Sequence, residues 1–284
     1  MSIGCISRRA PGFPALLAAI HDPPPRLFWR GDASPELLDR PAVAIVGARA
    51  CSSYGRSVAR SLGRDLAAAG LVVVSGLARG IDGEAHRGAL DGGGATVAVL
   101  GCGIDRDYPA AHGELARRIC SAGGLVVSEY EAGIEPAPWR FPARNRIIAG
   151  LCRATVVIEA RERSGALITA DFALEEGREV LAVPGEITSS LSAGVNALLR
   201  LGATPVTCAD DVLELFELER PARTSVTLGP LADALLALLA EQPLSGDELL
   251  RASGVDPGAG AGALIELELT GRVTQEDGVY RAAI

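Results

Sequence analysis

Lysine is missing from this sequence: all 27 basic residues among its 284 positions are arginine. A phosphate-binding loop of the G-x-x-x-x-G-K-[ST] type depends on its lysine, and so does Schiff-base chemistry with pyridoxal phosphate, so both classes are excluded. The six cysteines contain no C-x-x-C pair, and His21 and His112 follow no metal-ligand pattern. We therefore expect no cofactor and no metal site, and cysteines that remain free thiols in a reducing cytoplasm.

Long apolar stretches are also missing. No run approaches the roughly 18 uninterrupted apolar residues of a membrane span, and no apolar stretch follows Arg8 and Arg9 as it would in a signal peptide. We therefore expect a cytoplasmic protein that makes no membrane contact. With 48% hydrophobic and 22% charged residues the chain can build a core, and its length allows one large or two modest domains.

The charge is spread unevenly along the chain. The net charge of −8 opposes bulk binding of nucleic acid. Residues 41–160 nevertheless carry 13 arginines against 11 acidic residues, whereas residues 161–219 carry 4 against 11 and residues 220–284 carry 5 against 9. A polyanion is therefore expected to bind the first half of the central region.

The pattern of the sequence divides the chain into four segments. Residues 1–40 are rich in proline and predict an N-terminal arm or cap. Residues 41–219 alternate short β-branched runs with helical segments, which predicts an α/β domain with a doubly wound, mostly parallel, Rossmann-like sheet. Residues 220–230 have the composition of a linker. Residues 231–284 offer three helices and an Asp-Gly hairpin signal at 277–278, which together resemble a winged helix.

Six strands are predicted in the central domain, and each ends at or is followed by small or polar residues. They are Val43–Val46, Leu71–Ser75, Thr96–Leu100, Leu125–Ser128, Thr155–Glu159 and Val180–Val183. Because ligands of open α/β sheets bind outside the carboxyl ends of the strands, a binding site is expected at this edge. Glycines there would let a ligand approach the backbone closely.

Residues 141–150 read Phe-Pro-Ala-Arg-Asn-Arg-Ile-Ile-Ala-Gly and predict a loop that becomes a helix, with its proline at the bend. Arg144, Asn145 and Arg146 crowd the first turn, where the helix dipole already favours anions. Two guanidiniums there are explained if a phosphate binds them and the free N–H groups. Phe141 would then stack against a base. The alternative is a solvated arginine pair with Phe141 in the core.

Other loops at strand ends are further candidate anion sites. They contain Arg49 with Ser52 and Ser53, Gly76 and Leu77 with Arg79, Gly101, and Ser164 with Gly165. Around Gly101 the G-x-G pattern of a dinucleotide fingerprint is incomplete. The alternative at each loop is a tight turn followed by an ordinary helix cap. Asp82 and His86 lie one helical turn apart and are expected to form a helix start and a hydrogen-bonded histidine, so we predict no catalytic residue.

The third helix of the C-terminal segment, predicted at Gly262–Thr270, would read DNA in a winged helix. It offers Glu266 and Glu268 and no arginine before Arg272. Docking of a partner or formation of a dimer is therefore expected of this segment, rather than binding in a DNA groove.

Taken in order, these motifs resemble the DNA-processing protein A family (DprA, also called Smf). The resemblance spans residues 41 to about 216. The segments that carry it are Val43–Arg49, Ser75–Asp82, Ala85-His86, Tyr108-Pro109, Phe141–Gly150, Ser164-Gly165 and Ala182–Gly185. Many relatives have a lysine and an asparagine at the positions of Ala110 and His112, and a helical domain ahead of the core where this chain has only about 40 residues.

The resemblance implies a bacterial protein of natural transformation, without catalytic activity. Such a protein binds and protects incoming single-stranded DNA without sequence specificity, loads the RecA recombinase onto it and forms a homodimer. The DNA site is implied to lie on the Rossmann-like domain, with phosphates held by Arg49, Arg144 and Arg146. The candidate DNA-binding residues are Arg49, Ser52, Ser53, Gly76, Leu77, Arg79, Gly101, Phe141, Arg144, Asn145, Arg146, Ser164 and Gly165.

Three other functions stay open on the residues alone. Sheets of this kind also serve nucleoside-monophosphate phosphoribohydrolases, although their Pro-Gly-Gly-x-Gly-Thr loop is absent here and residues 164–169 stand in a comparable place. An NAD-binding regulator is disfavoured by the incomplete fingerprint. A structural adaptor would work through the winged helix alone.

Overall fold

The computed structural model describes residues 3–220, 228–276 and 278–282. It divides into two compact units, Met1–Pro221 and Ala222–Ile284, and each is described by itself. The predicted linker at 220–230 falls mainly on residues 221–227, which lie outside the described residues.

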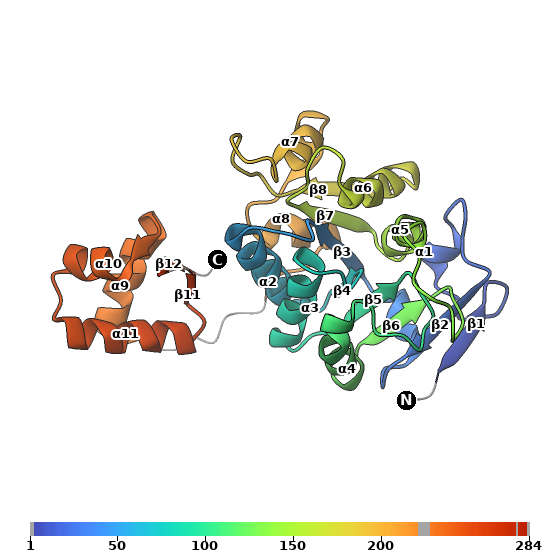
Figure 1. Cartoon of the computed structure of the whole chain (residues 1–284), viewed down its shortest axis with the longest axis horizontal. Coiled ribbons are helices and arrows are strands. Elements are labelled where there is room, and N and C mark those ends of the chain that lie inside the picture. Colours follow the sequence, from blue (N-terminus) through green and yellow to red (C-terminus); the bar gives the residue numbers. More distant parts are fainter. Residues whose placement is uncertain (1–2, 221–227, 277, 283–284) are drawn as a thin grey trace. The chain divides into compact units, whose positions relative to one another are not determined.

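The first unit is built on a nine-stranded sheet with the order β1-β2-β6-β5-β4-β3-β7-β8-β9 (Figure 1). Its strands are β1 (Gly4–Ser7), β2 (Arg26–Arg30), β3 (Ala42–Gly47), β4 (Val72–Ser75), β5 (Thr96–Leu100), β6 (Leu125–Ser128), β7 (Ala154–Ile158), β8 (Glu179–Ala182) and β9 (Thr204–Pro205). All pairs from β6 to β9 are parallel. Because β3, the first parallel strand in the chain, lies between β4 and β7, the sheet is wound in both directions, as the sequence predicts.

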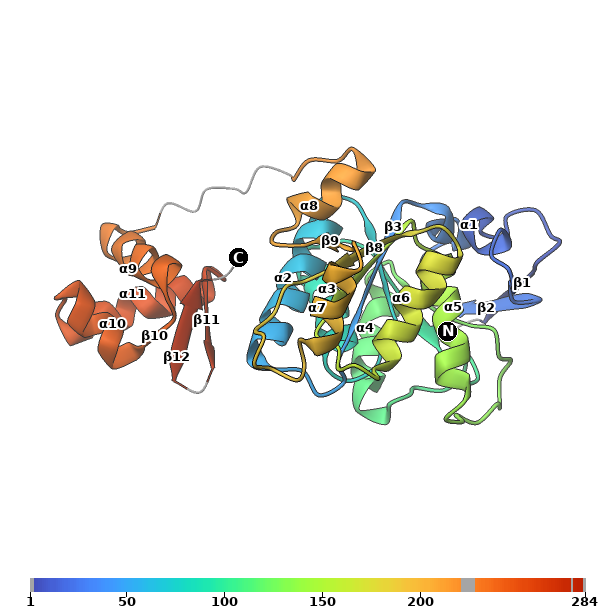
Figure 2. The same cartoon turned by 90° about the horizontal axis from the view of Figure 1, so that it is seen from above.

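Helices cover both faces of this sheet (Figures 1 and 2). They are α1 (Ala15–Ala18), α2 (Ser53–Ala68), α3 (Ile81–Asp91), α4 (Gly113–Ser121), α5 (Arg140–Gly150), α6 (Gly165–Glu175), α7 (Ala193–Arg200) and α8 (Asp210–Leu213), with 3-10 turns at Pro35–Asp39, Ala110–His112 and Glu214–Phe216. Neighbouring strand residues point to opposite faces, so Val43 and Ile45 pack with α2 and α3 while Ala44 and Val46 pack with α1, α5 and α6. Within the described residues, no helix is both long and apolar enough to cross a membrane.

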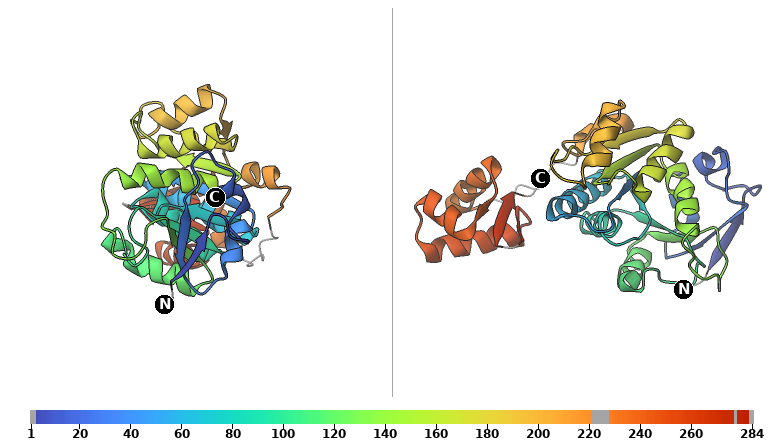
Figure 3. Two further views of the ribbon diagram at one scale, coloured as in Figure 1. Left: turned by 90° about the vertical axis from the view of Figure 1, so that its right-hand side faces the viewer. Right: turned by 45° about the horizontal axis from the view of Figure 1, so that its top comes forward.

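The N-terminal segment belongs to the sheet. Strand β2 pairs antiparallel with β6, and β1 pairs antiparallel with β2, so both extend the parallel sheet at one edge (Figure 3, blue). The sequence pattern did not predict these two strands. The two strands, Gly-Cys-Ile-Ser and Arg-Leu-Phe-Trp-Arg, are short, and proline and glycine lie near them in the sequence. They form because β2 pairs with the edge of β6, a contact that local sequence does not encode.

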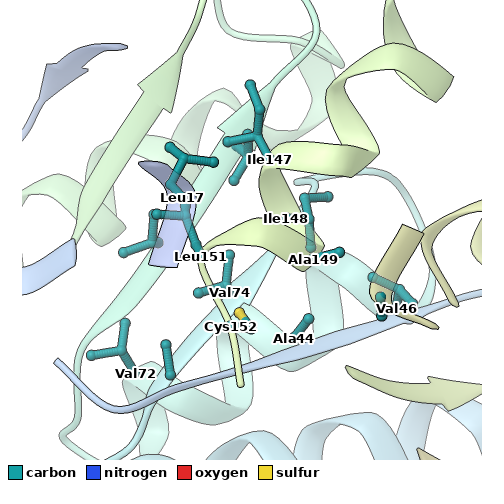
Figure 4. Packing of buried hydrophobic residues seen from close by; sticks show 14 of the residues in the cluster. Leu17, Ala44, Val46, Val72, Val74, Ile147, Ile148, Ala149, Leu151 and Cys152 are labelled. Carbon is teal, nitrogen blue, oxygen red and sulfur yellow. The ribbon is translucent and has the colours of Figure 1, made fainter. Parts of the chain in front are cut away.

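Helix α5 is held by its apolar side against the sheet. Ile147 and Ile148 are buried among Leu17 of α1 and the strand residues Val74 and Ala44 (Figure 4). The helix begins at Arg140, so the prediction of a bend at the proline in position 142 is wrong. A proline is tolerated in a first helical turn because the N–H groups there have no partner within the helix.

The second unit contains three helices and a small sheet with the order β10-β12-β11, which is a winged helix. Its elements are α9 (Pro230–Glu241), β10 (Leu244–Ser245), α10 (Gly246–Ser253), α11 (Pro257–Leu269), β11 (Val273–Glu276) and β12 (Val279–Ala282). Helix α11 begins five residues before the predicted Gly262, because Asp256 caps it by accepting the N–H groups of Gly258 and Ala259. The predicted hairpin signal falls partly on residue 277, outside the described residues.

Candidate nucleic-acid interface

The sheet reverses its winding between β3 and β7, and the loops that follow these strands separate there. A cavity of about 420 Å³ opens at this point, beyond the carboxyl ends of the strands. Residues 46–50, the first turns of α5 and residues 163–166 line it. This is the place where open α/β sheets bind their ligands.

A second cavity, of about 390 Å³, lies beyond the ends of β4 and β5. Arg49, Ala78, Phe141 and Arg144 line both cavities, so the two form one continuous depression, called here the rim groove.

Phe141 lies where the two halves of the rim groove meet. Its ring stacks with that of Tyr108, with the centroids 5.1 Å apart and the planes inclined by 25°. The guanidinium carbon of Arg49 lies 5.7 Å from the Phe141 centroid. A Cβ on Gly101 would come within 2.9 Å of the ring, so glycine at this position lets the ring pack closely. The half-buried ring thus lies in the groove between an aromatic and a cationic neighbour, which are the kinds of side chain that contact bases of single-stranded nucleic acid.

Arg144 lies beneath the rim groove, and its residue is only 4% exposed. Its Nη1 donates to the carbonyl oxygen of Gly76 at 2.9 Å and also to that of Val99. Burial lowers the pKa of Arg144 to about 10, and nearby Asp82 opposes this shift, so the guanidinium stays charged at neutral pH. Its main contacts therefore tie the end of β5 to the loop after β4.

Asp82 holds the loop after β4 from the other side. The contacts of Arg144 and Asp82 with this loop are together called here the clasp. One of its carboxylate oxygens accepts the N–H groups of Gly76 at 3.1 Å and Ala78 at 3.3 Å. Burial raises the pKa of Asp82, and Arg144 and these hydrogen bonds oppose the rise. A Cβ on Gly76 would come within 2.6 Å of Arg144 Nη2, so only glycine leaves room for the guanidinium. The N–H of Gly76, a candidate for phosphate, is engaged inside the protein.

Asn145 and Arg146, which follow Arg144 on α5, also form contacts within the protein. Asn145 donates to the carbonyl oxygen of Gly165 at 3.0 Å and so joins α5 to α6. Arg146 forms two hydrogen bonds with the carboxylate of Glu129, at 2.7 and 2.8 Å, and a further ion pair with Asp22 at 3.0 Å. The structure thus brings Phe141 to the groove but commits Arg144, Asn145 and Arg146 to holding it together.

At the start of α2, a carboxylate of the protein itself occupies the place where an anion would bind. The N–H of Ser52 donates to a carboxylate oxygen of Glu159 at 2.9 Å, and the Ser52 hydroxyl donates to the other oxygen. Ser52 Oγ also accepts the N–H of Gly55 and caps the helix. Neither Ser52 nor Ser53 lines the rim groove, and the carboxylate occupies the position that favours an anion.

Of the remaining candidate DNA-binding residues, three line the rim groove and one lies in the core. Arg79 is exposed and lines the rim groove, as do Ser164 and Gly165 at the start of α6. Leu77 is fully buried, and its carbonyl oxygen lies 2.9 Å from His112 Nδ1.

Two arginines that the sequence analysis missed also line the rim groove. Arg161 and Arg163 follow β7 and are exposed, as Arg49 follows β3. The signal that could have found them is the one that marks Arg49 and Arg79, an arginine shortly after a buried strand. Among the described residues, Arg49, Arg79, Arg161 and Arg163 form no ion pair.

No cluster of three or more histidine, cysteine, aspartate or glutamate side chains suited to a metal ion occurs in the described part of the chain.

Comparison with known proteins gives consistent matches. A family model described as "DNA recombination-mediator protein A" matches residues 4–217, and one described as "DprA winged helix domain" matches residues 219–279. The chain is 49% identical to the DNA processing protein DprA of Streptococcus pneumoniae over 205 residues, which cover 72% of this chain and 71% of the relative.

The solved structures that are similar to the chain include two of DNA processing protein A. The X-ray structure of DprA from Streptococcus pneumoniae has a TM-score of 0.70 at 45% identity, with 78% of this chain and 76% of that one covered. DNA processing protein A from Helicobacter pylori has a TM-score of 0.68 at 29% identity, with 77% of this chain and 98% of that one covered. Its structure was described for the single-stranded DNA binding mode of that protein.

Replacing Arg144 should cost stability. In Arg144→Met the carbonyls of Gly76 and Val99 lose a charged donor and buried Asp82 loses its countercharge, so we expect a loss of about 3–5 kcal/mol in the free energy of unfolding. Urea titration of both proteins measures it. The exposed Arg118 offers a control, and Arg118→Met should change the value by about 0.5 kcal/mol or less. Unchanged stability in Arg144→Met would show that the clasp is not structural.

Proposed function

Because the chain belongs to the DNA recombination-mediator protein A family, which includes the DprA and Smf proteins, we propose that it binds single-stranded DNA without sequence preference. The observation that carries the proposal is the set of exposed arginines around the rim groove, which lack a carboxylate partner among the described residues although the chain as a whole is acidic. Side chains that are charged, exposed and unpaired at a ligand crevice suit a polyanion.

In this proposal each side chain has a separate task. Arg49, Arg79, Arg161 and Arg163 contact successive phosphates, and Phe141 stacks a base. Arg144 holds the loops that carry these groups and does not itself contact the DNA. Contacts to the phosphate backbone carry no sequence information, and stacking tolerates every base, so binding would be independent of sequence.

We also propose that the chain is not an enzyme. Asp82, the acidic residue among those that line the rim groove, accepts backbone N–H groups, and Glu159 binds Ser52. The buried His86 contacts the hydroxyl of Thr96 at 2.7 Å. Burial lowers the pKa of His86 to about 3, so it is neutral at physiological pH.

The proposal extends to the events that follow DNA binding. The chain would protect incoming single strands in the cytoplasm during natural transformation and load RecA onto them. Family membership supports this part, since the matching family is described as a recombination mediator.

We further propose a homodimer that pairs through α6 and α7. A cavity of about 400 Å³ between these helices is lined by Ile168 and Leu201, whose residues are 37% and 84% exposed. The same cavity has Arg163 together with Glu162 and Asp171. A surface that offers both signs of charge around an apolar centre can face its own copy across a two-fold axis.

The salt dependence of binding tests the phosphate contacts. If four phosphates are neutralised, log K plotted against log salt for an oligothymidylate should have a slope of about −3, since each contact on a single strand contributes about −0.7. Arg49→Ala should make the slope less steep by about 0.7, whereas Phe141→Ala should lower affinity at an unchanged slope. Fluorescence anisotropy at several salt concentrations measures both.

Arg118→Ala serves as the matched control, because Arg118 is exposed on α4 and lines neither half of the rim groove. A slope near zero for the wild type, or an equal change in Arg118→Ala and Arg49→Ala, would refute the proposed contacts.

RecA loading is tested by the rate at which RecA assembles on a single strand. We expect the protein to shorten the lag before assembly, because it would deliver RecA to DNA that is already bound. Arg49→Ala should lengthen the lag again in proportion to its lost DNA affinity. An identical lag with and without the protein would contradict this part of the proposal.

The dimer is tested by introducing a charge into its proposed centre. Leu201→Glu places an unpaired carboxylate at each side of the two-fold axis, so light scattering should find a monomer where the wild type is a dimer. Leu269→Glu is the control, since Leu269 is 82% exposed on α11 of the second unit. Dissociation by Leu269→Glu alone would place the contact on the winged helix.

A further inference from the structure

A second aromatic cluster lies where α5 begins, just before Phe141 in the chain. Trp139, the residue before α5, is 63% exposed. The guanidinium carbon of Arg140 lies 4.8 Å from the centroid of the Trp139 ring and 5.0 Å from that of Tyr130. We call these three residues the outer stack. The chain has only 11 aromatic residues, and four of them belong to the outer stack or to the Tyr108–Phe141 pair.

The outer stack is held in place before any ligand arrives. The loop between β6 and α5 is tied to the loop after β5, where Ile104 donates its N–H to the carbonyl oxygen of Tyr130 at 3.2 Å and Gly103 donates to that of Ile134 at 2.8 Å. Gly133 donates to Asp105 at 2.9 Å. A ligand that stacks on Trp139 would therefore pay little for ordering the backbone around it.

The charge at the outer stack favours an anionic ligand. Glu129 pairs with Arg146, and Glu135 pairs with Arg106 at 2.6 Å, so two of the three carboxylates of this loop are neutralised. Arg140 itself donates to the carbonyl oxygen of Glu135 and has no ion pair within residues 3–220. Glu131, which is exposed, is the remaining acidic side chain of the loop.

We propose that the outer stack is a second base-binding platform, which receives a nucleotide flanking the one on Phe141; this inference rests on the proposed function. Trp139 and Phe141 lie two residues apart where α5 begins, so adjacent nucleotides of one strand can reach both rings around the start of the helix. One part of the indole is covered by the guanidinium, and the exposed part offers a flat surface to a base. The Arg140 charge favours the phosphate of that nucleotide.

The fluorescence of Trp139 reports on this contact directly. Trp29 is the other tryptophan and packs against the core, so Trp29→Phe leaves Trp139 as the sole emitter. In that background an oligothymidylate of about 20 nucleotides should quench the emission, because a base stacks on the indole.

Affinity gives the second measurement. Trp139→Ala should weaken binding of the strand of about 20 nucleotides by about 5- to 100-fold, as expected for the loss of one stacked base. Trp139→Phe retains a ring and should recover most of the loss.

The outcomes separate this inference from the function on which it rests. If the long strand binds and Phe141→Ala weakens it, but the emission and the affinity do not depend on Trp139, the outer stack is not a DNA platform and the proposed function stands. If the wild type does not bind the strand of about 20 nucleotides, both fail. Emission that changes with protein concentration and not with DNA would assign Trp139 to contact between copies and overturn the inference.

Discussion

The candidate site depends on the hydrogen bonds of one buried group, the guanidinium of Arg144. It binds the carbonyl oxygens of Gly76 and Val99, and Asp82 holds the N–H groups of the same loop from the other side. A charge buried this deeply is tolerated only when it is hydrogen-bonded and compensated. The loop ends of two neighbouring strands are thereby fixed to the helix that carries Phe141, so the rim groove has a defined shape without a ligand.

The arginines of this acidic chain fall into two groups with different chemistry. Arg144 and Arg146 are bound to carbonyls and carboxylates, so their charge is largely satisfied inside the protein. The exposed arginines that follow β3, β4 and β7 have no such partner among the described residues. At the start of α2, the position that favours an anion is already filled by the carboxylate of Glu159. The net charge of the chain does not reveal these two groups of arginines, because local, unpaired charge decides where a polyanion binds.

Much of the fold follows from local patterns, and less of the site does. Continuous β-branched runs predict the parallel strands because burial on both faces requires them. The strands β1 and β2 escaped prediction because they form only against the edge of β6, a contact remote in sequence. The segment containing Arg144 and Arg146 is predicted to be part of the site, and its residues 141, 142, 144, 145 and 148 line the rim groove. Its local spacing could not reveal that the partners of these arginines are Gly76, Val99 and Glu129, because those partners are remote in sequence.

The account is tested most directly by a crystal structure of the protein with a bound oligothymidylate. It predicts phosphates within hydrogen-bond distance of Arg49, Arg79 and the arginines after β7, and a base stacked on Phe141. Arg144 should keep its carbonyl partners and Arg146 its carboxylate. A strand bound on another face of the first unit, or one for which Arg146 leaves Glu129 to hold a phosphate, would contradict the division between structural and binding arginines.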